Sequence, residues 1–191
     1  PGPAYYQQQA DYVMEIELDE KNKMIYGNET ITYTNNSPDV LDYLWVQLDQ
    51  NVRKKDSPSL KIDGNGLRSL YRPSEFTSEF VDDPFDGGFN IDYVLDQNKK
   101  PLSHFINQTM MRINLPDPLK SGEKFSFSIR WWFNIPDHVK ENSRSGYEYF
   151  PGDGNSAFTI AQFFPRMAVY NEVEGWQNYQ FWGDGEFALP F

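Results

Sequence analysis

Residues 125–136 read FSFSIRWWFNIP, and this stretch decides the fold class. Its apolar side chains fall on every second residue: Phe125, Phe127, Ile129, Trp131 and Phe133. A period of two places all of them on the same face of a β-strand. Pro136 ends the pattern, because proline has no N–H to donate to a strand ladder. The stretch therefore predicts a long strand with one continuous apolar face.

The same alternation recurs along the rest of the chain. Residues 89–96 (FNIDYVLD) and 108–116 (QTMMRINLP) each predict a strand. Residues 12–18 and 24–35 alternate on either side of the turn-forming DEKNKM, which predicts a hairpin. Residues 43–48 carry bulky side chains on both faces, which is typical of a central strand between two packed layers.

Helical signals are missing by comparison. No segment longer than about eleven residues places apolar side chains at i, i+3, i+4 and i+7, and no period of roughly 20 to 50 residues repeats. Residues 53–88 are rich in charged and turn-forming residues and predict loops joined by short strands. The sequence thus predicts an all-β fold with little helix, a twisted sandwich or saddle of antiparallel strands.

The composition of the chain limits the classes of partner that it can bind. The 191 residues suit one domain, residues 1–191, and the aromatic content of 17% supplies ample apolar area for one core. The formal net charge of -11 opposes binding to phosphate backbones or anionic lipid heads. No stretch has the length of a membrane span. We therefore expect neither a nucleic-acid partner nor membrane insertion.

The chain contains no cysteine, which excludes disulfides, thiolate zinc ligands and a cysteine nucleophile. It opens on PGPAYYQQQADY without an initiator Met and stops on the apolar run GEFALPF. An apolar end lacks the polar tail that usually lets a terminus fray. We therefore expect the chain to be a piece of something longer.

Candidate catalytic groups are few. His104 and His138 are the two histidines, and neither has a second His or a Glu at metal-ligand spacing. Both are predicted to lie exposed in loops. A Ser-His-Asp triad stays open on spacing alone, but no G-x-S-x-G elbow occurs. The sequence therefore assigns no catalytic residue and no metal ligand.

Three carboxylates, Asp82, Asp83 and Asp86, precede two glycines and would suit Ca²⁺. Their spacing does not match the calcium loop, and Asp and Gly are the commonest turn formers, so we interpret them as a turn. The two GDG segments, at residues 152–154 and 183–185, are interpreted in the same way. Glycosylation sequons occur in ordinary strand and turn positions, at Asn28, Asn35 and Asn107.

Tryptophans offer a second kind of site. If exposed, they would form a stacking platform for sugars together with neighbouring tyrosines. The four in question are Trp131, Trp132, Trp176 and Trp182. Their positions within strand-like runs are also what a two-layer core or a domain interface demands, and we favour that interpretation.

Two blocks carry a family resemblance. Residues 161–176 read AQFFPRMAVYNEVEGW, and residues 11–51 read DYVMEIELDEKNKMIYGNETITYTNNSPDVLDYLWVQLDQN. The first resembles the signature that closes the N-terminal domain of the aminopeptidase N family of zinc metallopeptidases, and the second resembles the opening of that domain. Together they cover both ends and roughly half of the chain, in the family's order and at about its separation.

The resemblance implies a saddle-shaped β domain that packs on a thermolysin-like catalytic domain of the same protein, which removes N-terminal residues from peptides. The family's H-E-x-x-H helix and G-x-M-E-N loop do not occur here. They would lie beyond Phe191, together with the zinc ion, so no cofactor is expected in this fragment. Family habit also implies an exported protein, periplasmic or at the cell surface.

The resemblance singles out Gln162 as a substrate-binding residue. In the family a T-Q-x-E or T-Q-x-Q segment reaches the active site, where the first Gln lines the pocket for the substrate's first side chain and the next polar residue helps hold the α-amine. Here Phe164 stands at that second position, which puts amine recognition by this domain in doubt. The alternative for Gln162 is a strand-end amide that satisfies nearby backbone groups. Arg166 is expected to pair with acidic neighbours.

Two functional hypotheses result. The first is a non-catalytic N-terminal domain of a zinc aminopeptidase, with its own catalytic domain and peptide N-termini as partners. The alternative is a free-standing carbohydrate- or peptide-binding β-sandwich module. An H-E-x-x-H sequence downstream in the parent gene would separate them.

Overall fold

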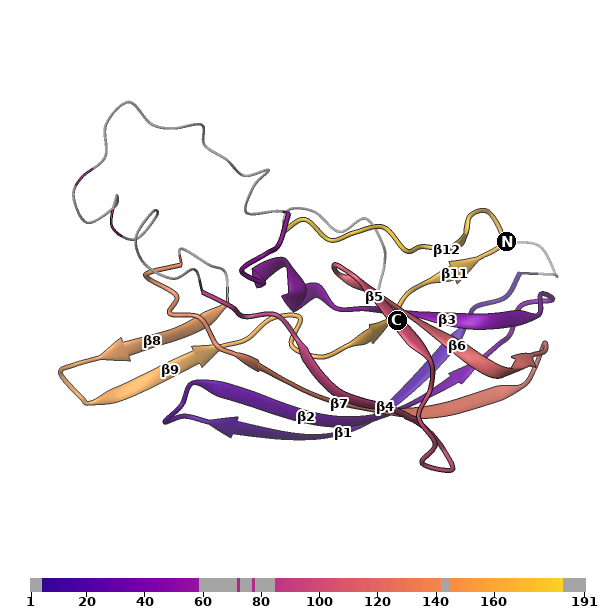
Figure 1. The fold of residues 1–191 in the computed structure, drawn as a ribbon, viewed down its shortest axis with the longest axis horizontal. Coiled ribbons are helices and arrows are strands. Elements are labelled where there is room, and N and C mark those ends of the chain that lie inside the picture. Colours follow the sequence, from indigo (N-terminus) through magenta and orange to yellow (C-terminus); the bar gives the residue numbers. More distant parts are fainter. Residues whose placement is uncertain (1–4, 59–71, 73–76, 78–84, 142–144, 184–191) are drawn as a thin grey trace.

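A computed structural model describes residues 5–58, 72, 77, 85–141 and 145–183 (Figure 1). The regular elements lying wholly within these ranges are twelve strands and one short 3-10 helix. The first sheet has the strand order β1 (Gln9–Asp19), β2 (Met24–Thr34), β7 (Lys124–Asn134), β4 (Asn90–Asp96). All its neighbouring strands are antiparallel. The predicted all-β, antiparallel fold class is confirmed.

The second sheet has the order β10 (Arg166–Met167), β3 (Leu41–Gln47), β6 (Met110–Leu119), β5 (His104–Asn107), again antiparallel. The chain passes between the sheets after β2, β3, β4 and β6 and returns to the second sheet before β10, so each sheet contains strands from distant parts of the sequence. Figure 1 shows the two sheets as stacked layers. As predicted, β3 lies inside its sheet.

Residues 125–134 of the deciding stretch lie in β7, and their apolar face is at the centre of the core. Phe127, Ile129 and Trp131 are fully buried, and Phe133 is 1% exposed. Leu44 and Val46 of β3, both fully buried, belong to the same apolar cluster. At roughly 25 cal/mol per Å² of apolar surface removed from water, this face dominates the stability of the fold.

Trp131 requires a glycine on the neighbouring strand. Gly27 of β2 pairs with Trp131 across the strands. A Cβ at Gly27 would lie 2.2 Å from Cζ2 of the indole, closer than real contacts allow. Trp131 also packs against Phe89 and Phe133, with ring centroids 5.4 Å and 5.8 Å away. Trp131 therefore belongs to the core, as the favoured interpretation predicts, and not to an exposed stacking platform.

Strand β1 matches its predicted face only in part. Tyr12 and Met14 are half-buried, but Ile16 and Leu18 are 42% and 40% exposed. Strand β1 is at the edge of its sheet, and the second sheet covers only part of the first (Figure 1). The alternating pattern of residues 12–18 therefore predicts the strand correctly, but it predicts burial only for the first half of that strand.

Several predicted details are corrected or fall outside the described residues. His104 begins β5 and pairs with Ile113 of β6 rather than lying in a loop, although it is exposed as expected. Its four-residue strand is too short for a period to be recognised. Asp82 and Asp83 lie outside the described residues, as does much of the 53–88 segment. Gly152–Gly154 form the expected turn.

Asn35 illustrates why a sequon need not be a modification site. It is fully buried, and its Nδ2 donates to the carbonyls of Asp39 and Leu119 at 2.8 Å and 3.0 Å. Its Oδ1 accepts hydrogen bonds from the N–H and the hydroxyl of Ser37. The Asn35 side chain thus holds neighbouring loop and strand backbone together through hydrogen bonds. This agrees with the interpretation of Asn35 as an ordinary structural residue.

A hairpin of β8 (Gly146–Phe150) and β9 (Asn155–Thr159) extends from the sandwich (Figure 1). An isolated two-stranded hairpin is marginal in water. Lys23, in the β1–β2 turn, reaches it: its Nζ donates to Oγ of Ser156 at 2.9 Å. The same Nζ lies 4.8 Å and 4.9 Å from the ring centroids of Tyr147 and Phe158.

We expect Lys23→Met to loosen this hairpin while leaving the sandwich intact. The substitution keeps an unbranched stem and removes the ammonium, with a loss of roughly 1–2 kcal/mol in cation–π and hydrogen-bond energy. Amide hydrogen exchange in β8 and β9 should accelerate about five- to thirtyfold. Lys21→Met, in the same turn but exposed, is the control and should leave exchange unchanged. Equal exchange in both variants would contradict this role of Lys23.

The C-terminal part adds two short strands, β11 (Tyr170–Asn171) and β12 (Gly175–Trp176), which pair with each other. Trp176 packs on Tyr33 and Tyr170, with ring centroids 5.8 Å and 5.2 Å away. Trp132 is half-buried and lies 6.5 Å from the ring of Tyr26. Trp132 and Trp176 therefore pack against different residues.

No helix within the described ranges is long and apolar enough to cross a membrane.

Candidate functional site

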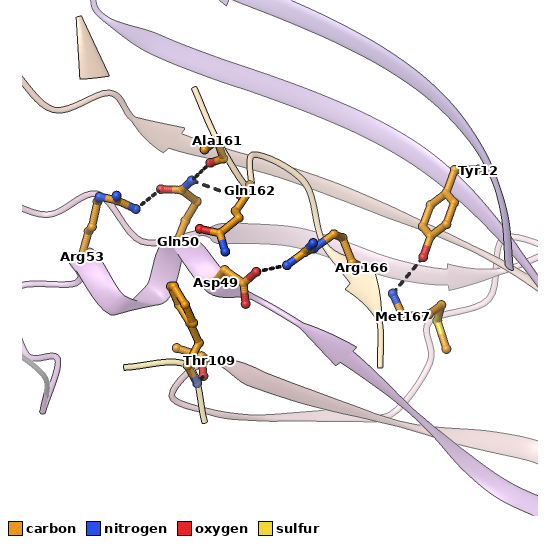
Figure 2. Close-up of polar contacts among 10 residues, drawn as sticks. Tyr12, Asp49, Gln50, Arg53, Thr109, Ala161, Gln162, Arg166 and Met167 are labelled. Atoms are coloured by element: carbon orange, nitrogen blue, oxygen red, sulfur yellow. Dashed lines mark hydrogen bonds and ion pairs between the residues drawn. The ribbon is translucent and has the colours of Figure 1, made fainter. Parts of the chain in front are cut away.

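The two sequence blocks that carry the family resemblance meet at one place. Strand β3 runs into a 3-10 helix, η1 (Asp49–Arg53), and residues 161–165 run into β10. The antiparallel pairing of β3 with β10 joins Gln47 to Arg166 and Val46 to Met167. The segment leaving β3 therefore lies beside the segment entering β10 (Figure 2).

Helix η1 holds three buried polar residues in succession, Asp49, Gln50 and Asn51. Asn51 supports its base: Nδ2 donates to the carbonyl of Gln108 at 2.7 Å, and Oδ1 accepts from the N–H of Phe89 at 2.8 Å. Buried polar groups are stable only when they are hydrogen-bonded, and the Asn51 amide bonds to backbone groups that lie outside the strands. Such partners explain why a polar run, DQN at residues 49–51, directly follows the strand.

Gln50 connects η1 to the 161–162 segment. Its Nε2 donates to the carbonyl of Ala161 at 2.7 Å and to that of Gln162 at 3.2 Å. Its Oε1 accepts from Nη1 of Arg53 at 3.0 Å. Gln50 is 1% exposed. Sequence reasoning missed this residue, because a buried amide that serves backbone groups produces no periodic pattern.

Gln162 lies between the two bonded carbonyls. Its backbone φ is 51°, in the left-handed region that residues other than glycine rarely adopt. Its side chain is half-buried, and among the described residues no hydrogen bond of its amide is found. Figure 2 shows this amide on the same side of the segment as Asp49 and Gln50. The carbonyls of Ala161 and Gln162 accept hydrogen bonds from Gln50.

Arg166 pairs with Asp49 through Nη2 and Oδ2, as the sequence led us to expect of a residue with acidic neighbours. The side chains are 14% and 6% exposed, so this is a buried ion pair. Its formation fixes the start of β10 on η1. Breaking such a pair leaves a charge without water or counter-charge, which is costly.

Phe164 packs inward instead of offering a polar group. Its ring meets that of Tyr12 edge-on, with centroids 5.7 Å apart. The Tyr12 hydroxyl accepts a hydrogen bond from the N–H of Met167 at 2.9 Å, and burial raises the pKa of Tyr12 to about 12. Tyr12 is thus neutral throughout the ordinary pH range. Phe164 stands where the family that the chain resembles has a second polar residue, and here the side chain packs as an apolar one.

The C-terminal segment is fixed beside the same site through Thr109. Its hydroxyl and its N–H both donate to Oε1 of Gln180, at 2.8 Å and 2.9 Å. The hydroxyl oxygen also accepts from the N–H of Phe181 at 2.7 Å. Residues 180–181 therefore run alongside the β5–β6 turn.

Metal-binding side chains do not gather within the described ranges. No group of three or more His, Cys, Asp or Glu side chains there has the geometry to hold a metal ion. His104 Nδ1 lies 3.0 Å from the carbonyl of Leu102, and Asp86 is exposed. The structure thus brings together Gln162, Arg166 and η1.

No protein-family profile and no curated protein sequence matches this chain. Among solved structures, an M1 zinc metallopeptidase from Deinococcus radiodurans overlaps with 90% of this chain and 28% of its own, at 10% identity and a TM-score of 0.43. A mutant from the same organism, bound to a Tyr-Ser-Ala substrate, covers 68% of this chain and 21% of its own, at 11% identity and a TM-score of 0.41.

A mutant two-domain M1 zinc metallopeptidase bound to L-tryptophan covers 92% of this chain and 29% of its own, at 11% identity and a TM-score of 0.43. The chain thus spans less than a third of the length of these proteins. Its structural neighbours include M1 zinc metallopeptidases at low sequence identity, and overlaps of this size carry no assignment of function.

Proposed function

We propose that residues 1–191 form the non-catalytic N-terminal domain of a zinc aminopeptidase that removes N-terminal residues from peptides. One observation carries the proposal: the two blocks that resemble the aminopeptidase N family, residues 11–51 and 161–176, meet through η1 and β10. The contacts between them hold one residue, Gln162, with an amide that bonds to no other described residue. The zinc ion and the chemical step belong to a catalytic domain on which this domain packs.

In this proposal the Gln162 amide lines the pocket for the first side chain of the peptide. An amide offers one acceptor and two donors, so it can select among polar and apolar first residues. Phe164 packs on Tyr12 and offers no acceptor for an ammonium group. The proposal therefore assigns to this domain a contribution to side-chain preference, whereas its contribution to binding the α-amine is in doubt.

Gln162→Ala in the longer protein should change substrate preference without changing stability. A lost pocket hydrogen bond of roughly 0.5–1.5 kcal/mol alters the ratio of kcat/KM between substrates with different first residues by about two- to twelvefold. The melting temperature of the 1–191 chain should stay nearly unchanged, because no hydrogen bond of this amide is found among the described residues.

Gln9→Ala is the matched control, since Gln9 is an exposed amide on β1 remote from η1 in the sequence. It should leave both preference and melting temperature unchanged. If Gln162→Ala destabilises the chain by several kcal/mol and leaves preference untouched, Gln162 is a structural amide and the pocket assignment is wrong.

A further inference from the structure

Gln50 controls both peptide planes that flank Gln162. The carbonyl of Ala161 belongs to the plane before the Cα of Gln162, and the carbonyl of Gln162 belongs to the plane after it. Nε2 of Gln50 donates to both, at 2.7 Å and 3.2 Å. Fixing two successive peptide planes fixes the φ and ψ between them, because the peptide unit itself is rigid.

The conformation fixed in this way is an unfavourable one. A φ of 51° brings Cβ close to the following carbonyl oxygen, so an unrestrained glutamine would leave it. The direction in which the Gln162 side chain leaves the backbone depends on this φ. The two hydrogen bonds from Gln50 therefore determine where the Gln162 amide points.

Arg53 determines how the Gln50 amide is turned. Its Nη1 donates to Oε1 of Gln50 at 3.0 Å, and a guanidinium has donors only. The oxygen of the Gln50 amide must therefore face Arg53, and its NH₂ group must face the two carbonyls. Both N–H bonds of that group are used, which suits a side chain that is 1% exposed.

We propose that Gln50 is a positioning residue that holds Gln162 in the left-handed conformation and so aims its amide at the first side chain of a peptide substrate. The statement about substrate rests on the proposed function. The statement that Gln50 holds the backbone of Gln162 does not, and it can be tested on the 1–191 chain alone.

The decisive variant is Gln50→Glu. It keeps the length of the side chain and the acceptor for Arg53, but it has no N–H to donate and sets a carboxylate against two carbonyl oxygens. In the 1–191 chain we expect the one-bond Cα–Hα coupling of Gln162 in NMR to change from its positive-φ value to a negative-φ value. The carbonyl ¹³C shifts of Ala161 and Gln162 should change with it. Unchanged NMR parameters at Gln162 would overturn the proposal.

In the longer protein, Gln50→Glu should alter the kcat/KM ratio between substrates with different first residues by about two- to twelvefold, as Gln162→Ala does. The double variant should show no further change, because both act through one amide. If Gln162→Ala changes preference and Gln50→Glu does not, Gln50 does not position Gln162 for substrate.

Two further outcomes of these experiments can also be interpreted. If Gln162→Ala leaves preference unchanged, the pocket assignment under the proposed function fails, while the NMR result still accepts or rejects the holding role of Gln50. If Gln50→Glu does not fold, Gln50→Met replaces it, since methionine has a similar length and no donor or charge. The same changes at Gln162 are then expected, and their absence overturns the proposal.

Discussion

Glu29→Gln is expected to raise the free energy of unfolding by about 3 kcal/mol at pH 7 and to have little effect at pH 4. Glu29 lies on the core face of β2, where it pairs with Met14 and Ile129 and is 1% exposed. Within the described part of the chain, neither carboxylate oxygen of Glu29 makes a hydrogen bond of good geometry, and the same holds for the indole N–H of Trp131. Burial raises the pKa of Glu29 to about 9, and the Trp131 indole N–H, which lowers it, offsets only part of that effect.

The sign of the effect follows from proton binding. Between the ordinary carboxyl pKa of 4.5 and the folded pKa of about 9, the folded chain keeps the proton on Glu29 and the unfolded chain loses it. Stability from this group is therefore fully present below pH 4.5 and falls by about 1.4 kcal/mol per pH unit above it, until the folded pKa is reached. A glutamine stays neutral and removes this dependence.

Urea unfolding at pH 4, 5.5, 7 and 8.5 measures the effect. The difference between Glu29→Gln and the natural chain should grow steadily over this series. Glu17→Gln, at an exposed position of β1, should leave the pH profile as it is. A Glu29→Gln chain that is less stable at pH 7, or that has an unchanged pH profile, would show that the carboxylate is charged and paired in the fold.

Asp49→Ala is expected to reduce the free energy of unfolding by roughly 3–5 kcal/mol. It removes the partner of Arg166, whose side chain is 14% exposed and whose Nε is already buried without a hydrogen bond in the described structure. An arginine cannot release its charge by deprotonation, so the unpaired guanidinium must remain charged. The start of β10 and the 161–165 segment should loosen first.

The double variant Asp49→Ala with Arg166→Leu distinguishes the loss of the ion pair from the cost of leaving one buried charge unpaired. Removing both charges should recover much of the lost stability, because an apolar replacement of a buried pair is often neutral. The exposed pair of Asp92 and Arg130, 3.5 Å apart, is the matched control, and Asp92→Ala should cost less than about 1 kcal/mol. Equal losses at Asp49 and Asp92, measured by urea unfolding, would contradict the buried-pair account.

The sequence predicted β7 because its alternation corresponds directly to burial. In β7 every second residue from Phe127 to Phe133 is in the core, and the pattern can be seen without the structure. Strand β10 has two residues and β5 has four, too few for a period. They exist because β3 and β6 provide hydrogen-bonding edges, which is a tertiary effect.

The candidate site was predictable only in part. The resemblance pointed to Gln162, and Arg166 was expected to pair with an acidic neighbour, which the structure identifies as Asp49. Gln50 and its bonds to two carbonyls were missed, since they depend on the pairing of β3 with β10. Glu29 did leave a signal, because it has the same parity as Ile25 and Ile31 in β2 and so had to face the core.

The proposed role, a non-catalytic domain of a zinc aminopeptidase, can be tested by a peptidase assay. Release of N-terminal residues from peptides is compared for the 1–191 chain and for the longer protein, with and without a metal chelator. We predict no turnover and no zinc retained after dialysis for the chain alone, and chelator-sensitive turnover for the longer protein. Chelator-sensitive turnover by the 1–191 chain, or a longer protein that is inactive when zinc is supplied, would contradict the account.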